Sequence, residues 1–169
     1  SHAHPTQALL DVFTIRRHRP DFANLRVAIV GDVRHSRVAH STIHALRTLG
    51  TTDIRVVGPE HFLPDNADTL GVTALGDIAQ GLADADVVMG LRIQRERIEG
   101  DALAGVDDYH QQFGLTAANL AHAKKDALIM HPGPINRGVE INADIAYGQQ
   151  SVILEQVTNG IAIRMAVMA

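Results

Sequence analysis

The segment 91–97 has side chains suited to binding a carboxylate. It reads Leu-Arg-Ile-Gln-Arg-Glu-Arg and follows directly after an apolar run. Arg92 and Gln94 alternate with Ile93, so both polar side chains are predicted to project into one cleft. A guanidinium is a planar two-pronged donor that matches a carboxylate, and a glutamine amide adds a neutral donor. The charged residues 95–97 are better explained as an exposed ion-pair face, which contributes little free energy.

A second basic segment, 31–41, reads Gly-Asp-Val-Arg-His-Ser-Arg-Val-Ala-His-Ser. It separates an apolar run from a helical pattern, which predicts that Arg37 lies near a helix N-terminus. Backbone N–H groups and the helix dipole favour anions there, so a carboxylate or phosphate is the expected ligand. Considered alone, an arginine cluster of this kind is better explained as a solvated turn. Val33 and Ser36 stand where a dinucleotide fingerprint needs glycine, so no nicotinamide cofactor is expected.

The segment 131–137, which reads His-Pro-Gly-Pro-Ile-Asn-Arg, also follows an apolar run. Pro132 and Pro134 lack a backbone N–H, so the turn around Gly133 presents mainly carbonyl oxygens. A fixed set of carbonyls can accept hydrogen bonds from an amine or amide ligand. The alternative is a rigid turn that ends a strand, with His131 in a structural role.

The N-terminal segment reads Ser-His-Ala-His-Pro-Thr-Gln. Pro5 is typical of a helix start and places His4 and Gln7 near a helix N-terminus. His2 and His4 are spaced like metal ligands, but no carboxylate or cysteine partner is near them in sequence, so no metal site is predicted. The absence of an initial Met, together with a helical pattern that begins at once, suggests a piece cut from a longer chain.

The elements that position these segments alternate between strand and helix. Short, β-branched apolar runs bounded by Gly or Pro occupy 25–30, 54–57, 87–91 and 127–130, with a weaker candidate at 71–75. Helical patterns occupy 6–17, 38–49, 77–82, 117–124 and 149–169, and 100–114 is expected to be a surface loop. The pattern predicts a single α/β domain, a doubly wound, Rossmann-like parallel sheet with helices on both faces. Ligands of such sheets bind beyond the carboxyl ends of the strands, where the segments 31–41, 91–97 and 131–137 are predicted to lie.

Composition excludes several classes of protein. The 169 residues have a net charge of −4, a pI near 6.2 and no cysteine. We therefore expect no nucleic-acid partner, no disulfide and no thiolate metal site. No apolar run is long enough for a membrane span, and a cytoplasmic location is the default expectation.

Taken together, these segments resemble the aspartate carbamoyltransferase family. The resemblance runs from His4 to the C-terminus, through motifs in the family's order and spacing. These are His-Pro-Thr-Gln at 4–7, Arg-Val-Ala-His-Ser at 37–41, Arg-Ile-Gln-Arg-Glu-Arg at 92–97 and His-Pro-Gly-Pro at 131–134. Ornithine carbamoyltransferases typically have Cys where Thr6 stands, and arginines suit a dicarboxylate better than cationic ornithine.

The resemblance implies a role for each candidate residue. His4 and Gln7 match catalytic residues that contact the carbamoyl group. Arg37 matches the arginine that binds the α-carboxylate of aspartate, whereas Arg92 and Gln94 match the pair that holds its side-chain carboxylate. The backbone carbonyls at 132 and 133, which belong to Pro132 and Gly133, match those that accept from the carbamoyl NH₂ and the substrate amine. The family usually has a larger residue where Gly133 stands, and its turn implies a cis Gly133–Pro134 bond.

The implied reaction joins L-aspartate and carbamoyl phosphate to give N-carbamoyl-L-aspartate and phosphate in pyrimidine biosynthesis, without cofactor. Positioning and hydrogen bonds to the developing negative charge would supply catalysis. The family's carbamoyl-phosphate motifs are not found in 1–169, so this is expected to be the aspartate-binding domain, inactive without the N-terminal half of the chain. The parent enzyme is expected to be a homotrimer with potential regulatory or dihydroorotase-like partner chains. The alternatives are an ornithine-type transferase and a non-catalytic anion-binding or regulatory module on the same fold.

The two end segments, 1–20 and 149–169, are expected to be the interdomain helices of such an enzyme. Both carry apolar residues on more than one face, which predicts burial on all sides when the missing half is present. Without it, several of these side chains would face water or a second copy of the chain.

Overall fold

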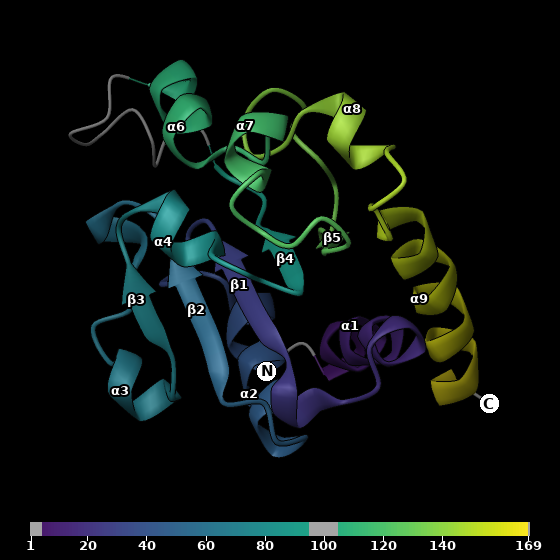
Figure 1. Cartoon of the computed structure of the whole chain (residues 1–169). Coiled ribbons are helices and arrows are strands. Elements are labelled where there is room, and N and C mark those ends of the chain that lie inside the picture. The colour runs from purple at the N-terminus through teal and green to yellow at the C-terminus, as the bar shows by residue number, and fades with distance from the viewer. Residues whose placement is uncertain (1–4, 95–104, 169) are drawn as a thin grey trace.

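The computed structural model describes residues 5–94 and 105–168 and contains one five-stranded parallel sheet (Figure 1). Its strand order is β3-β2-β1-β4-β5, which is the order of a doubly wound sheet. The strands are β1 (Arg26–Val30), β2 (Asp53–Val57), β3 (Thr73–Leu75), β4 (Val87–Gly90) and β5 (Leu128–Met130). The predicted fold class is confirmed, and the weak strand candidate at 71–75 forms the edge strand β3.

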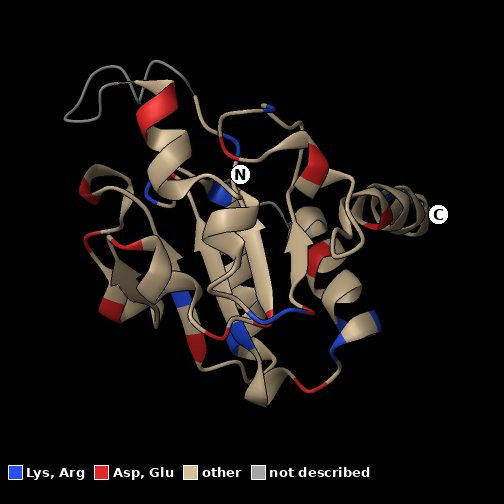
Figure 2. Cartoon of the chain, turned by 45° about the horizontal axis from the view of Figure 1, so that its top comes forward, with Lys and Arg blue, Asp and Glu red and all other residues tan. Residues whose placement is uncertain are grey.

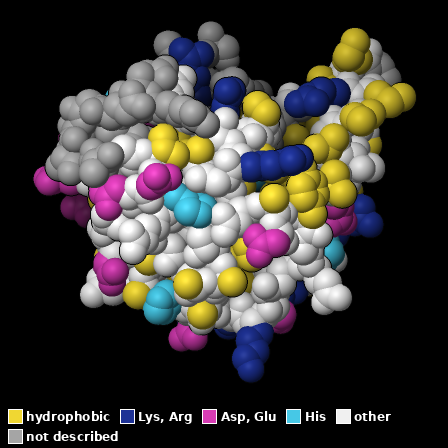
Figure 3. All heavy atoms as spheres, turned by 90° about the horizontal axis from the view of Figure 1, so that it is seen from above, with side chains coloured by type: hydrophobic (Ala, Val, Ile, Leu, Met, Phe, Trp, Pro, Cys, Tyr) yellow, Lys and Arg dark blue, Asp and Glu magenta, His cyan; other side chains and the backbone are white. Residues whose placement is uncertain are grey.

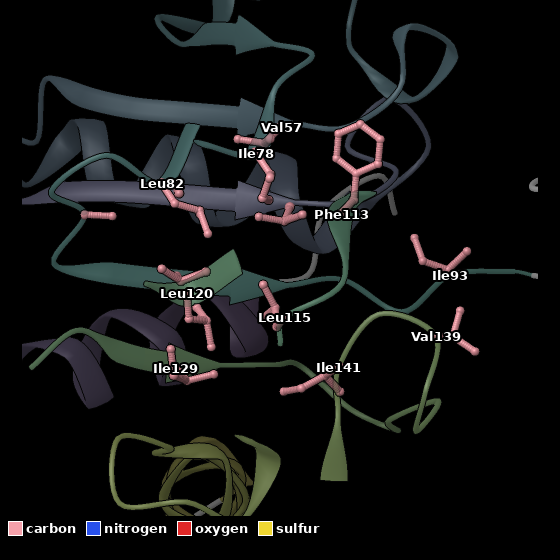
Figure 4. Close-up of a cluster of buried hydrophobic side chains, with 14 of the residues drawn as sticks. Val57, Ile78, Leu82, Ile93, Phe113, Leu115, Leu120, Ile129, Val139 and Ile141 are labelled. Atoms are coloured by element: carbon pink, nitrogen blue, oxygen red, sulfur yellow. The ribbon is translucent and has the colours of Figure 1, made fainter. Parts of the chain in front are cut away.

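The apolar runs form strands because both faces of the sheet are covered. In β1, Val27 and Ile29 belong to one buried cluster, while Ala28 and Val30 belong to the other. Successive side chains of a strand point to opposite faces, so a strand buried on both sides needs a continuous apolar run. Figure 4 shows one of the two clusters, in which side chains of helices and loops meet those of the strands.

Helices cover the two faces in separate layers. The helices are α1 (Pro5–His18), α2 (Arg37–Thr48), α3 (Ala67–Leu70), α4 (Ile78–Leu82), α6 (Val106–Phe113), α7 (Ala117–Leu120), α8 (Ala143–Ala146) and α9 (Ile153–Met168), with short 3-10 turns η1 (Phe22–Asn24) and η2 (Glu60–Phe62). Side chains of α1 and α2 share a cluster on one face, and those of α4, α6 and α7 share the cluster on the other. Helix α9 packs against α1 beside the β5 edge of the sheet (Figure 1).

Three predicted element boundaries were wrong. The segment 106–113 forms helix α6 rather than a loop, because Tyr109 and Phe113 are buried on its inner side at helical spacing. Helix α7 ends at Leu120 rather than at 124. Helix α9 begins at Ile153 rather than at 149.

Helix α9 has two distinct faces. Gln156, Asn159 and Gly160 are buried, and a Cβ added at Gly160 would lie 3.2 Å from Cδ2 of Leu10 on α1. The opposite face exposes Leu154, Val157, Ile161, Met165 and Met168, each at least 56% exposed and spaced by three or four residues. Figure 3 shows hydrophobic side chains gathered over the arm of the molecule that α9 forms. This apolar face of α9 is therefore unpartnered within the described part of the chain.

Charged residues lie mostly in loops, at strand ends and in helices (Figure 2). Among the described residues, no helix has the length and apolar character needed to cross a membrane.

Candidate functional site

The carboxyl ends of β1 and β4 lie side by side and form a polar pocket of about 210 Å³. Its lining residues are Asp32, His35, Ser36, Arg92 and Gln94. The two strands pair in register, with Val30 opposite Gly90, and Leu91 N–H donates to the Val30 carbonyl at 2.9 Å. The parallel pairing therefore brings together two polar segments that are about sixty residues apart, as the strand order of a doubly wound sheet requires.

Gly31 makes the close approach of these two segments feasible. Its φ is +138°, a backbone conformation that side chains rarely adopt, and a Cβ there would lie 2.9 Å from Cβ of Leu91. Any larger residue would push the Asp32 segment away from the Arg92 segment.

The first loop is held by its own side chains. Asp32 is buried, and its Oδ1 accepts from the His35 backbone N–H at 3.2 Å and contacts His35 Nδ1 at 2.9 Å. Ser36 caps α2, its Oγ accepting from the Ala39 N–H at 3.1 Å. The loop thereby directs the N-terminus of a twelve-residue helix toward the pocket, where the helix dipole favours an anion.

The predicted alternation of the second segment is confirmed. Ile93 is buried, while Arg92 and Gln94 are exposed and both line the pocket. Arg92 has no hydrogen-bond partner within residues 5–94 and 105–168, so its guanidinium remains available to a ligand. Arg37 is the first residue of α2 and is exposed, but it is not among the residues that line this pocket.

A second pocket, of about 140 Å³, lies between α1, α9 and the turn that follows β5. It brings Gln7 together with Pro132 and Gly133, and Gln156 and Arg164 of α9 complete its polar lining. The Gly133–Pro134 bond is cis, as predicted. His4, the other predicted catalytic residue, lies outside the described residues.

His131 anchors the turn in this second pocket. Its ring is buried, Nδ1 accepts from the Gly133 N–H at 2.8 Å, and Nε2 lies 2.9 Å from Oε1 of Glu140. Because Nδ1 is an acceptor, the ring proton is assigned to Nε2, which donates to Glu140. Oε1 of Glu140 also accepts from the Asn136 N–H at 2.8 Å. The structural interpretation of His131 is therefore the one that the geometry supports.

Two buried residues of the second pocket's surroundings, Glu140 and Asp11, were not singled out in the sequence. Glu140 lies nine positions from its His131 partner, and only the fold shows that they meet. Asp11 could have been noticed in the sequence, because it is a single acidic residue between the apolar Leu10 and Val12 of a predicted helix. Burial raises the pKa of Asp11 to about 6 against the lowering effect of hydrogen bonds from Gln156, Thr42 and Gln7.

The topology and the position of the polar pocket define a doubly wound α/β domain with its polar site at the switch between β1 and β4. The family described as "Aspartate/ornithine carbamoyltransferase, Asp/Orn binding domain" matches residues 23–169. The chain therefore belongs to the aspartate/ornithine carbamoyltransferase family and contains its amino-acid-binding domain.

Solved structures of the same family resemble the chain over nearly its whole length. Ornithine carbamoyltransferase from Pyrococcus furiosus is 30% identical, with a TM-score of 0.81, and the match covers 99% of this chain and 56% of that one. The enzyme from Gloeobacter violaceus is 28% identical, with a TM-score of 0.81 and coverage of 99% and 58%. Aspartate transcarbamoylase from Trypanosoma cruzi, in complex with N-(phosphonacetyl)-L-aspartic acid, is 25% identical, with a TM-score of 0.80 and coverage of 98% and 55%. The chain thus spans little more than half the length of these structures. The comparisons confirm the carbamoyltransferase family but do not separate its aspartate and ornithine types.

Proposed function

We propose that the chain is the aspartate-binding half of an aspartate carbamoyltransferase. The observation that carries this proposal is the polar pocket at the ends of β1 and β4, which Arg92, Gln94 and the N-terminal end of α2 surround. A guanidinium with no partner among the described residues, an amide and a helix N-terminus are together suited to a carboxylate. The activity would form N-carbamoyl-L-aspartate and phosphate, a step of pyrimidine biosynthesis.

The charges of this pocket favour aspartate over ornithine. Among the described residues that line it, the one carboxylate is Asp32, which is already engaged by the backbone and the ring of His35. Arg92 would repel the side-chain ammonium of ornithine and attract the side-chain carboxylate of aspartate. The ornithine alternative is supported by the slightly higher identity to the ornithine enzymes named above, and the binding experiment below decides between the two.

In the proposed reaction, the amine of aspartate attacks the carbamoyl carbon, the C–O bond to phosphate breaks, and phosphate leaves with the electron pair while the amine loses a proton. Arg92 and Gln94 would hold the side-chain carboxylate, and Arg37 the α-carboxylate. His4 and Gln7 would contact the carbamoyl group, and the carbonyls of Pro132 and Gly133 would accept from its NH₂ and from the amine. Catalysis would come from positioning the two reactants.

We further propose that a carbamoyl-phosphate-binding half completes the site and that α1 and α9 connect the two halves. The exposed apolar face of α9 supports this, because apolar stripes of this length are normally covered. So does an apolar groove of about 320 Å³ between α1, α9 and η1, lined mainly by Leu9, Val12, Phe13 and Ile163. A trimeric parent with regulatory or dihydroorotase-like chains, and a cytoplasmic location, remain part of the same proposal.

Ligand binding to the ¹⁵N-labelled chain tests the substrate. Titration with L-aspartate, with succinate and with L-ornithine is followed by NMR, with each backbone amide as a probe. We expect the two dicarboxylates to shift amides in 31–37 and 91–94, and ornithine to leave them unchanged.

Ornithine shifts at the same amides, without aspartate shifts, would assign the ornithine type instead. Equal binding of unrelated anions such as phosphate and sulfate at these amides would favour a non-catalytic anion-binding module.

A further inference from the structure

Helix α1 carries a carboxylate, Asp11, that is completely buried where α1, α2 and α9 meet. Three uncharged side chains donate to it. Gln7 Nε2 and Gln156 Nε2 each lie 3.0 Å from Oδ1, and Thr42 Oγ1 lies 3.0 Å from Oδ2. Asp11 has no cationic partner in the part of the chain that the structure describes. A buried carboxylate of this kind is expensive, and an apolar residue would pack there without that penalty.

Asp11 determines the orientation of the side-chain amides of Gln7 and Gln156. An ionised carboxylate only accepts, so each glutamine must direct its NH₂ group toward Asp11 and its carbonyl oxygen away. For Gln156, that oxygen accepts from the His131 backbone N–H at 2.9 Å. For Gln7, which lines the second pocket, the oxygen is left for that pocket.

The turn beside Gln7 has no backbone donor to offer. The His131 N–H is taken by Gln156, and the Gly133 N–H by the ring of His131. Pro132 and Pro134 have no N–H at all. The backbone of 131–134 can therefore offer a ligand only carbonyl oxygens, and His131, Pro132 and Gly133 line the same pocket as Gln7.

We propose that Asp11 is a positioning residue that makes one wall of the second pocket, formed by Gln7 and the 131–134 turn, an acceptor surface for an NH₂ group. It turns the Gln7 carbonyl into the pocket, and through Gln156 it fixes the first residue of the His131–Pro134 turn. This inference deepens the proposed function, because the NH₂ group would be that of the carbamoyl group.

The test separates Asp11's link to the pocket from its contribution to packing. In Asp11→Leu, both glutamines lose their acceptor. We expect the side-chain NH₂ signals of Gln7 and Gln156 to shift in NMR spectra of the ¹⁵N-labelled chain. The His131 N–H should exchange with solvent roughly tenfold faster or more, as expected for a weakened buried hydrogen bond.

Three further variants keep the test decisive if Asp11→Leu does not fold. Asp11→Asn retains an oxygen that can accept from both glutamines, so it should restore the wild-type signals. Gln156→Met removes the hydrogen bonds that link Asp11 to the His131 N–H but leaves the bond between Asp11 and Gln7. The NMR signals of the His131 and Gly133 amides should therefore change, while that of the Gln7 side chain should not. Thr42→Val is the matched control, because it removes the bond to Oδ2, which leads to no pocket residue. It should leave all of these signals in place.

Kinetics in the complete transferase, with this domain in its full chain, provide the functional readout. For Asp11→Leu, or for Gln156→Met if that variant alone folds, we expect kcat to fall roughly tenfold or more. The KM for the amino acid should change by less than about threefold, since Arg92 and Gln94 bind it in the other pocket. Unchanged Gln7, Gln156 and His131 signals in folded Asp11→Leu, or an unchanged His131 amide in Gln156→Met if that variant alone folds, would overturn the proposal whatever the activity. Altered signals with an unchanged kcat would overturn its catalytic part. A wild-type enzyme that transfers no carbamoyl group would refute the proposed function, and the NMR signals alone would then decide whether Asp11 positions Gln7 and the turn.

Discussion

Asn136 donates its side-chain amide to the backbone carbonyl of Ile93 at 3.0 Å, and this bond ties the two pockets together. Ile93 lies between Arg92 and Gln94 in the polar pocket, whereas Asn136 follows the turn of the second pocket. Since the Asn136 N–H is also held by Glu140, the second pocket's turn and the Arg92 segment share one rigid connection.

Replacing Asn136 by Ala should loosen this connection. The Ile93 carbonyl would lose a partner, and we expect the free energy of unfolding to fall by about 1–2 kcal/mol. Urea denaturation measures the change. Asn24→Ala is the control, because its amide bonds only to the exposed Asp21 three residues away, and it should cost less than about 0.5 kcal/mol. Equal losses in the two variants would show that the Asn136–Ile93 bond has no special role.

Arg92→Ala should weaken the use of aspartate far more than the binding of carbamoyl phosphate. Loss of a charge-assisted hydrogen-bonded pair costs about 1.5–3 kcal/mol, or roughly tenfold to more than a hundredfold in kcat/KM for aspartate. Steady-state kinetics of the complete enzyme measure it. Arg47→Ala is matched in charge and lies in the last turn of α2, at the far end of that helix, so its kinetics should be unchanged. If Arg92→Ala also leaves kcat/KM unchanged, Arg92 is only a surface charge.

The stability of the chain should reveal the titration of Asp11. Burial raises its pKa from 3.8 to about 6 in the folded state, so between these pH values the folded protein binds more protons than the unfolded one. Stability therefore falls as the pH rises through this window, and above it the ionised carboxylate costs about 3 kcal/mol. Because asparagine does not ionise, Asp11→Asn removes this pH-dependent cost. The variant should be more stable than the wild type at pH 7–8, and the difference should disappear near pH 4. Urea denaturation of both proteins across this range measures it, and a constant difference would contradict the raised pKa.

The exposed face of α9 should be needed for assembly but not for folding. Ile161→Glu places a charge on the apolar face of α9, and because the side chain is already 56% exposed, the chain itself should lose less than about 1 kcal/mol. Association with a carbamoyl-phosphate-binding half should be lost. Ala166→Glu adds the same charge at an exposed position of α9 that is not three or four residues from any member of the stripe, and this variant should associate normally. Co-purification and sedimentation compare the two, and normal association of Ile161→Glu would exclude this face as the contact.

The sheet and the polar pocket could be predicted from local sequence, whereas the buried polar contacts could not. Continuous apolar runs ending at Gly31 or before His131 identify strands buried on both faces, and the strand-order rule then brings Arg92 close to Asp32. Helix α6 was missed because only Tyr109 and Phe113 mark its buried side among polar neighbours. The bond between Asp11 and Gln156 spans 145 residues, and no local pattern encodes a contact of that range.

The most direct measurement of the central claim is carbamoyl transfer by the chain when a carbamoyl-phosphate-binding half is supplied with it. ¹⁴C-carbamoyl phosphate is offered with L-aspartate or with L-ornithine, and the labelled products are separated. We predict no product from the chain alone and N-carbamoyl-L-aspartate from the combined halves, with little or no carbamoylated ornithine. Carbamoylated ornithine as the main product, or transfer by the chain alone in the absence of contaminating enzyme, would contradict the account.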